Sequence, residues 1–184
     1  MCVKIKNKEN KTEDQKQSLN IKLYDVITED KLNKIKEIWK NETPKTINKI
    51  AAWIGDAVIE EKNKRKVMPL IEEIAVEMLN YSELEKEAKI LLMMRLMDDK
   101  KVIKFAVDEL KNMVEEYERT DKEPKYLENI LFIIDKYSKE DYSAIFYLER
   151  LYNTASKDKK NNTIDYIRRV YLKVYELYSK KELW

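Results

Sequence analysis

Apolar residues return every three or four positions along most of this chain, and that spacing predicts amphipathic α-helices. After residue 29 the pattern divides into eight such stretches, separated by short polar segments. The most regular stretch runs from residue 99 to 119, and its apolar side consists of Ile103, Ala106, Val107, Leu110, Val114 and Tyr117. We therefore expect an all-α protein.

Residues that can accept a hydrogen bond from a free backbone N–H group mark where these helices should begin. Thr43 followed by Pro44 is a strong start signal, because proline has no N–H group to satisfy at the first helical position. Ser82 and Glu85 have the spacing of a capping box, in which each side chain satisfies a backbone donor near the other. Further starts are expected at Asp30, Asp98–Asp99, Pro124, Ser138 with Asp141, and Asn162 with Asp165.

The same pattern predicts one folded domain preceded by a polar tail. Residues 1–29 are expected to be a disordered tail with a short extended segment at 21–26. Residues 30–184 are expected to be a single all-helical domain with an N-terminal helix, three helix pairs and a C-terminal capping helix. Short turns between the helices predict that successive helices are antiparallel. The basic run Lys62–Lys66 is expected to be a loop that joins the helices of the first pair.

The helix starts also recur at a regular interval. Pro44, Glu83, Pro124 and Thr163 lie about 40 residues apart, which is a period typical of repeats built from helix pairs. With proline at the start of two first helices and Asp108 in a second helix, residues 44–183 resemble HEAT-like or armadillo-like repeats. The resemblance implies an α-solenoid of antiparallel helix pairs whose second helices line a binding surface. A compact multi-helix bundle is the alternative architecture.

Composition removes several classes of function. The chain has no histidine, one glycine and one cysteine. Without histidine it lacks the commonest general base and metal ligand, and one glycine is too few for a phosphate-binding loop or a dinucleotide-binding turn. One cysteine excludes an internal disulfide, which favours a reducing compartment. We therefore expect a cytoplasmic, non-enzymatic protein without a metal or cofactor.

The charged residues are abundant but balanced, with 37 basic and 35 acidic side chains and a net charge of +2. This balance argues against a general polyanion binder and suits helices with ion pairs on their solvent faces. No apolar stretch is long enough to cross a membrane, and the polar N-terminus lacks the apolar core of a secretion signal.

The predicted function is therefore that of a protein–protein interaction scaffold, which binds another protein or a second copy of itself. Exposed tyrosine and arginine side chains are favoured at binding interfaces, although tyrosines also lie at the edges of helical cores. The candidate interaction surface consists of Lys104, Lys111, Arg119, Tyr142, Arg150, Tyr166, Arg169 and Lys173.

Nucleic-acid binding in a basic groove with aromatic residues is the alternative function. It would depend on two basic runs, Lys62–Lys66 and Lys157–Lys160, together with aromatic side chains that stack on bases. The balanced charge weighs against it, and so does the expectation that the two runs lie on opposite edges of the helical stack. The partner is accordingly expected to be a protein rather than a nucleic acid or a membrane.

Two single residues each allow a structural and a functional interpretation. Arg95 interrupts the apolar run of residues 90–97, so it should be partly buried and should need a carboxylate partner. Either it forms a structural ion pair or it binds an anionic ligand in a pocket. Gly55 lies inside a predicted helix, where it permits either a close approach of two helices or a functional kink.

Overall fold

The computed structural model describes residues 26–157 and 163–182, and over these residues the chain is all-α, as predicted. No strand occurs within these two ranges. The helices of the described chain are α1 (Glu29–Ile38), a short 3₁₀ turn η1 (Trp39–Asn41), α2 (Pro44–Asp56), α3 (Glu61–Leu79), α4 (Lys86–Arg95), α5 (Val102–Thr120), α6 (Leu127–Tyr137), α7 (Ile145–Ala155) and α8 (Ile164–Glu182).

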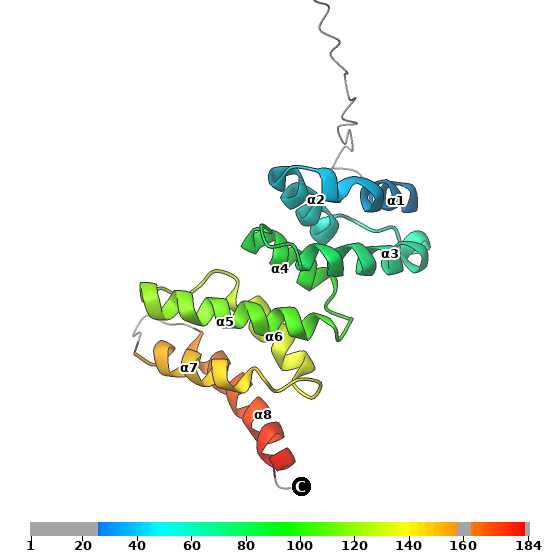
Figure 1. Cartoon of the computed structure of the whole chain (residues 1–184). Helices are drawn as coiled ribbons and strands as arrows, with labels where there is room; N and C mark the ends of the chain where they lie inside the picture. The colour runs from blue at the N-terminus through cyan, green and yellow to red at the C-terminus, as the bar shows by residue number, and fades with distance from the viewer. Residues whose placement is uncertain (1–25, 158–162, 183–184) are drawn as a thin grey trace, which may run out of the picture.

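Alternate helices lie side by side. The helix α1 packs on α3, α2 packs on α4, α5 packs on α7, and both α4 and α8 contact α6. The ribbon in Figure 1 runs from α1 and α2 at one end of the molecule to α7 and α8 at the other. The odd-numbered and even-numbered helices contact each other chiefly where α5 meets α6 and where α7 meets α8.

The helices that pair with each other therefore differ from the predicted pairs by one helix along the chain. The sequence pattern joins the helix that starts near Pro124 with residues 144–155, whereas α6 packs mainly on α5 and α8 mainly on α7. The backbone explains part of this difference. Asp121 follows the last residue of α5 in a left-handed conformation with φ of 51°, which ends the helix and turns the chain back.

Several predicted boundaries are wrong. The basic run Lys62–Lys66 lies in the first turns of α3 instead of a loop, because lysine and arginine favour helix and Pro69 is tolerated within α3. The helix predicted to begin at Pro124 begins at Leu127, after Tyr126 in a left-handed conformation with φ of 66°. Helix α2 ends at Asp56, and Val58 beyond it is exposed.

The predicted caps have a mixed outcome. Thr43 caps α2 by accepting a hydrogen bond from the Thr46 N–H group, as expected. Thr28 rather than Asp30 caps α1. The Asp99 carboxylate accepts from the Lys101 N–H group in the turn before α5, which begins at Val102 without a side-chain cap. Asp141 likewise accepts from Ser143 in the turn before α7, and Asn162 lies outside the described residues.

The predicted capping box of Ser82 and Glu85 is replaced by a contact from another helix. Asn48 of α2 is buried, and its Oδ1 accepts a hydrogen bond of 2.7 Å from the Glu85 N–H group at the start of α4. Its Nδ2 donates to the carbonyl oxygens of Pro44 at 3.0 Å and Glu83 at 3.1 Å. One side chain therefore ties the start of α4 to α2.

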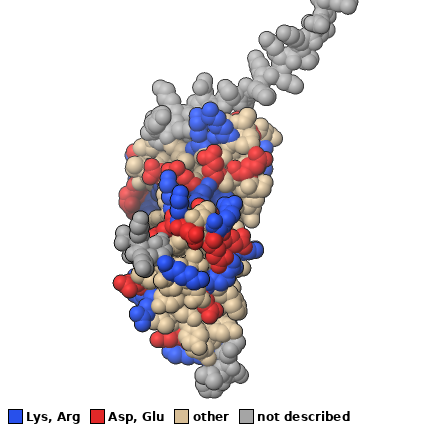
Figure 2. Space-filling model, turned by 90° about the vertical axis from the view of Figure 1, so that its left-hand side faces the viewer, with Lys and Arg blue, Asp and Glu red and all other residues tan. Residues whose placement is uncertain are grey.

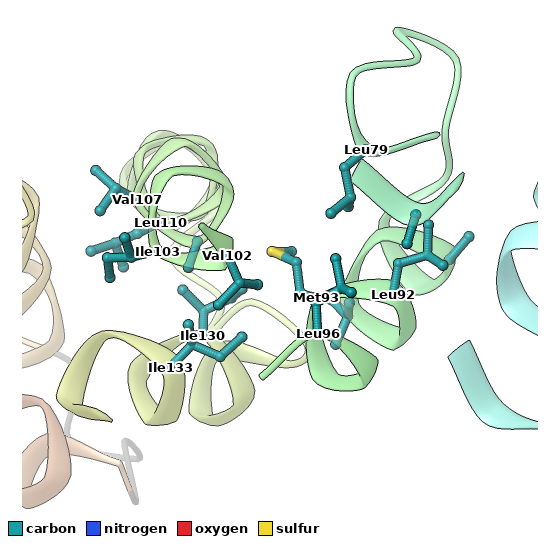
Figure 3. Packing of buried hydrophobic residues seen from close by; sticks show 14 of the residues in the cluster. Leu79, Leu92, Met93, Leu96, Val102, Ile103, Val107, Leu110, Ile130 and Ile133 are labelled. Carbon is teal, nitrogen blue, oxygen red and sulfur yellow. The ribbon is translucent and has the colours of Figure 1, made fainter. Parts of the chain in front are cut away.

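The tight packing of α2 on α4 also depends on Gly55. A Cβ atom at this position would lie 2.5 Å from Leu91 Cβ and 2.6 Å from the Leu91 carbonyl carbon. Such distances are far inside van der Waals contact, so the close-approach interpretation of Gly55 is confirmed. The apolar core continues from this contact through α4 into the next helices. In Figure 3, Met93 of α4 faces Val102 of α5, and Ile130 of α6 lies beside Val102.

Candidate interaction surface

Exposed apolar side chains gather on the last two helices. Phe146 of α7 is 62% exposed, and Leu172 and Tyr175 of α8 are 46% and 50% exposed. The buried stripe of α8 consists of Ile167, Val170 and Val174, so the helical period places Leu172 and Tyr175 on a different side of that helix. We call Phe146, Leu172 and Tyr175 the α7–α8 face.

Aromatic contacts hold the rings around this face in place. The ring of Tyr178 packs edge-on against Tyr142 at 5.9 Å and against Phe146 at 6.4 Å between centroids. Tyr171 stacks on Tyr152 at 6.1 Å and also contacts Tyr175 at 6.1 Å. Edge-on and stacked pairs of this kind restrict ring motion. Two of the three residues of the α7–α8 face, Phe146 and Tyr175, therefore have a ring contact on one side.

Basic side chains lie over two tyrosine rings of the last two helices and the turn before them. The Lys181 ammonium group lies 4.7 Å from the centroid of the Tyr142 ring, and the Arg169 guanidinium lies 4.7 Å from that of Tyr166. Burial raises the pKa of Tyr166, and the nearby Asp135 carboxylate raises it further. Burial also raises the pKa of Tyr171.

The structure distributes the eight predicted surface residues over several regions. Lys104, Lys111 and Arg119 are exposed on α5. Arg150 and Lys173 are engaged between helices, because Arg150 Nη2 lies 2.6 Å from Glu118 Oε2 and Lys173 Nζ lies 2.6 Å from Asp135 Oδ1. Tyr142 belongs to the ring cluster beside the α7–α8 face, and Tyr166 and Arg169 form their own pair on α8. The eight residues do not form one patch.

Sequence reasoning missed Phe146 and Leu172 as surface residues. Both lie off the apolar stripe of their helices, and that is the signal that could have found them. An apolar side chain outside the buried stripe of its helix indicates either an exposed residue or an additional contact.

Many surface charges are used to join neighbouring helices. The pairs that cross between elements include Lys36–Glu73, Lys86–Glu116, Lys136–Asp98, Arg150–Glu118 and Lys173–Asp135. Figure 2 shows basic and acidic residues interspersed on the face that it displays. On α3, Lys62 pairs with Glu60 at 3.0 Å, and residues 158–160 of the second basic run lie outside the described residues. This arrangement leaves no large basic area on the face in Figure 2.

Arg95 lies in a pocket of about 530 Å³ between the end of α2, the start of α3 and the end of α4. The prediction of a carboxylate partner is wrong, because Arg95 binds backbone carbonyl oxygens. Its Nε donates to the Ile54 carbonyl at 3.1 Å, and its Nη2 donates to the Ala57 carbonyl at 2.5 Å. These carbonyls end α2, where the helix dipole is negative. Burial lowers the pKa of Arg95, and nearby Asp56 opposes that effect.

Two of the carboxylates that line the pocket around Arg95 have ion-pair partners. Glu61 pairs with Lys64 at 3.9 Å, and Asp98 pairs with Lys136 at 2.8 Å. The apolar part of the lining includes Met68, Met94 and Met97. Arg95 thus binds backbone oxygens at the junction of three helices. These contacts support a structural role for Arg95 rather than the binding of an anionic ligand.

The described part of the chain contains no cluster of three or more histidine, cysteine, aspartate or glutamate residues with the geometry of a metal site. None of its helices combines the length and the apolar character that a membrane crossing requires. Comparison with family models, curated protein sequences and solved structures finds no significant match to this chain.

Proposed function

We propose that this protein is a non-enzymatic interaction scaffold, a HEAT-like α-solenoid whose α7–α8 face binds protein. The observation that carries the proposal is the gathering of Phe146, Leu172 and Tyr175 at one end of the molecule. Contiguous exposed apolar residues with polar surroundings are typical of protein–protein interaction sites. The proposal involves no metal and no cofactor.

Support for a solenoid comes from the order of the helix contacts. The main contacts of α1 are with α3 and η1, and the main contacts of α8 are with α7 and α6. In a solenoid each repeat contacts its neighbours, whereas in a compact bundle the first and last helices share one core. The layered path of the chain in Figure 1 fits the first arrangement.

The composition of the α7–α8 face favours a protein as the ligand. Aromatic residues are enriched among the side chains that contribute most to binding energy, and their rigid rings lose little entropy on association. A nucleic-acid ligand has less support, because lysines that would be needed for phosphate contacts, such as Lys62, Lys86 and Lys136, are paired with carboxylates.

Affinity capture from native lysate tests this function, with the full chain immobilised and the lysate treated with nuclease. The wild-type protein is expected to retain bound protein, either another chain or soluble copies of itself, after nuclease treatment. The variant Phe146→Ser/Leu172→Ser/Tyr175→Ser is expected to lose it. The matched control is Phe132→Ser, which removes an exposed apolar residue on α6 that is not part of the α7–α8 face, and should leave capture unchanged.

Two outcomes of the capture experiment would contradict the proposal. If the triple variant is folded by circular dichroism and retains the same proteins as the wild type, the α7–α8 face does not bind protein. If nuclease removes everything that the wild type retains, nucleic acid is the ligand.

A further inference from the structure

Three residues on the exposed side of α8 are spaced four positions apart. The first is basic, the second is apolar and the third is acidic. These are Arg168, Leu172 and Glu176, and all three are exposed. Residues four positions apart lie one above the other on the same side of a helix, so the three form a row along α8. None of the ion pairs found among the described residues uses Arg168 or Glu176, whereas Lys173 on another side of α8 pairs with Asp135.

This row has a symmetry that a second copy of the same helix can match. If two α8 helices lie antiparallel and meet at Leu172, a two-fold axis passes between the two leucines. The equal spacing then places Arg168 opposite Glu176 of the second copy, and Glu176 opposite Arg168 of the second copy. An interface of this kind is isologous, because the same surface on both copies forms the contact.

Apolar side chains lie beside the row of Arg168, Leu172 and Glu176, where a contact between two α8 helices would bury them. Tyr175 lies one helical turn from Leu172, and its ring rests on Tyr171. Phe146 of α7 is exposed and its ring contacts Tyr178 of α8. In Figure 1, α7 and α8 lie at one end of the described helices, and no described helix covers them beyond that end. The structure thus leaves an apolar surface with both charge signs in a self-complementary order.

We propose that a second copy of this chain occupies the α7–α8 face in a two-fold symmetric dimer, with antiparallel α8 helices that meet at Leu172. This inference rests on the proposed function and names the partner of its interaction surface. Charge complementarity favours a second copy as the partner, because the two-fold axis creates two Arg168–Glu176 contacts. In them each copy's Arg168 and each copy's Glu176 meets a residue of opposite charge. An unrelated partner would need no such symmetric order.

Sedimentation velocity of the full-length protein over a wide concentration range tests the dimer. The wild type is expected to change from monomer to dimer with increasing concentration. Leu172→Asp is expected to remain monomeric, because it places two carboxylates together at the two-fold axis. Arg168→Glu and Glu176→Arg are each expected to weaken dimerisation about tenfold or more, because each creates two like-charge contacts.

The double variant Arg168→Glu/Glu176→Arg gives the sharpest comparison. It exchanges the two charges and restores both opposite-charge contacts, so its dimerisation constant is expected to return to within about threefold of the wild type. Phe132→Ser on α6 is the matched control and should dimerise like the wild type. Circular dichroism melting of every variant shows whether it is folded.

Two results would overturn the dimer. One is a wild-type protein that stays monomeric up to its solubility limit, and the other is a double variant as weak as the single variants. These results are distinct from failure of the proposed function. A monomeric wild type whose α7–α8 face still captures a different protein retains the function and loses the dimer. A dimer whose triple α7–α8 face variant still dimerises overturns the two-fold contact at Leu172, and the capture experiment decides the proposed function separately.

Discussion

Gly55 shows how much one missing side chain decides at the contact of α2 with α4. Its backbone lies so close to Leu91 that a methyl group would overlap both the Leu91 side chain and the Leu91 carbonyl group. A side chain can rotate away from a new neighbour, but the backbone of a packed helix cannot do so without moving the helix. The contact therefore requires glycine at this position.

Replacing Gly55 with alanine tests this requirement. Alanine favours helix over glycine by about 1 kcal/mol, whereas overpacking against a fixed backbone typically costs about 1–3 kcal/mol. We expect the second effect to win and the free energy of unfolding in urea to fall by about 1 kcal/mol or more. Lys49→Ala, at an exposed position of the same helix, is the control and should change it by less than about 0.5 kcal/mol. An unchanged or increased stability of Gly55→Ala would show that α2 and α4 are not this close.

At the scale of the element, helix starts in this protein are satisfied in two different ways. Thr43 and Thr28 satisfy backbone donors in their own helices, within three residues. The start of α4 instead receives its acceptor from Asn48, which lies 37 residues earlier in the chain. Helices whose first N–H groups are buried need such a partner, and the source of that partner is set by packing.

Substituting Asn48 with alanine should destabilise the junction of α2 and α4. The change removes the buried Asn48 amide, the partner of the Glu85 N–H group and of the Pro44 and Glu83 carbonyls, at an expected loss of about 1–3 kcal/mol. Thermal and urea unfolding measure this effect. Asn80→Ala is the control, since the Asn80 side chain donates to Val76 at an exposed site and its loss should have an effect of about 0.5 kcal/mol or less. Equal effects of the two substitutions would refute the role assigned to Asn48.

Across the whole molecule, helices contact their neighbours and the two ends are remote from each other. Such an arrangement predicts that a local loss of packing spreads only as far as the nearest helices. A bundle with one central core would instead lose stability throughout. The distinction can be measured without knowing any ligand.

Hydrogen exchange measured by mass spectrometry after Val174→Ala provides that measurement. Val174 is fully buried in α8, and its truncation should destabilise its surroundings by about 2 kcal/mol. Exchange is expected to accelerate in α6, α7 and α8 and to stay at the wild-type rate in α1–α3. Leu32→Ala in α1 is the matched variant and should give the opposite distribution. Faster exchange in all eight helices in both variants would favour a single cooperative bundle.

Much of the helical content could be predicted because it depends on local information. The spacing of apolar residues identified the buried side of α5, and the Thr43–Pro44 signal located the start of α2. Gly55 was interpreted correctly because glycine inside an amphipathic helix has few structural explanations. For the predicted interaction surface, the sequence indicates which residues are polar but not which of them face another helix. Arg150 and Lys173 are examples, because each binds a carboxylate on a neighbouring helix.

The sequence by itself determined that this chain is helical, approximately where each helix lies, and which side of each helix is apolar, because helical periodicity and local capping act within a few residues. The tertiary structure decided which helices are neighbours and which partners serve Glu85 and Arg95. It also decided that the apolar residues of the α7–α8 face remain uncovered by the described helices. These features depend on contacts between residues far apart in the chain, and no pattern within one helix specifies them.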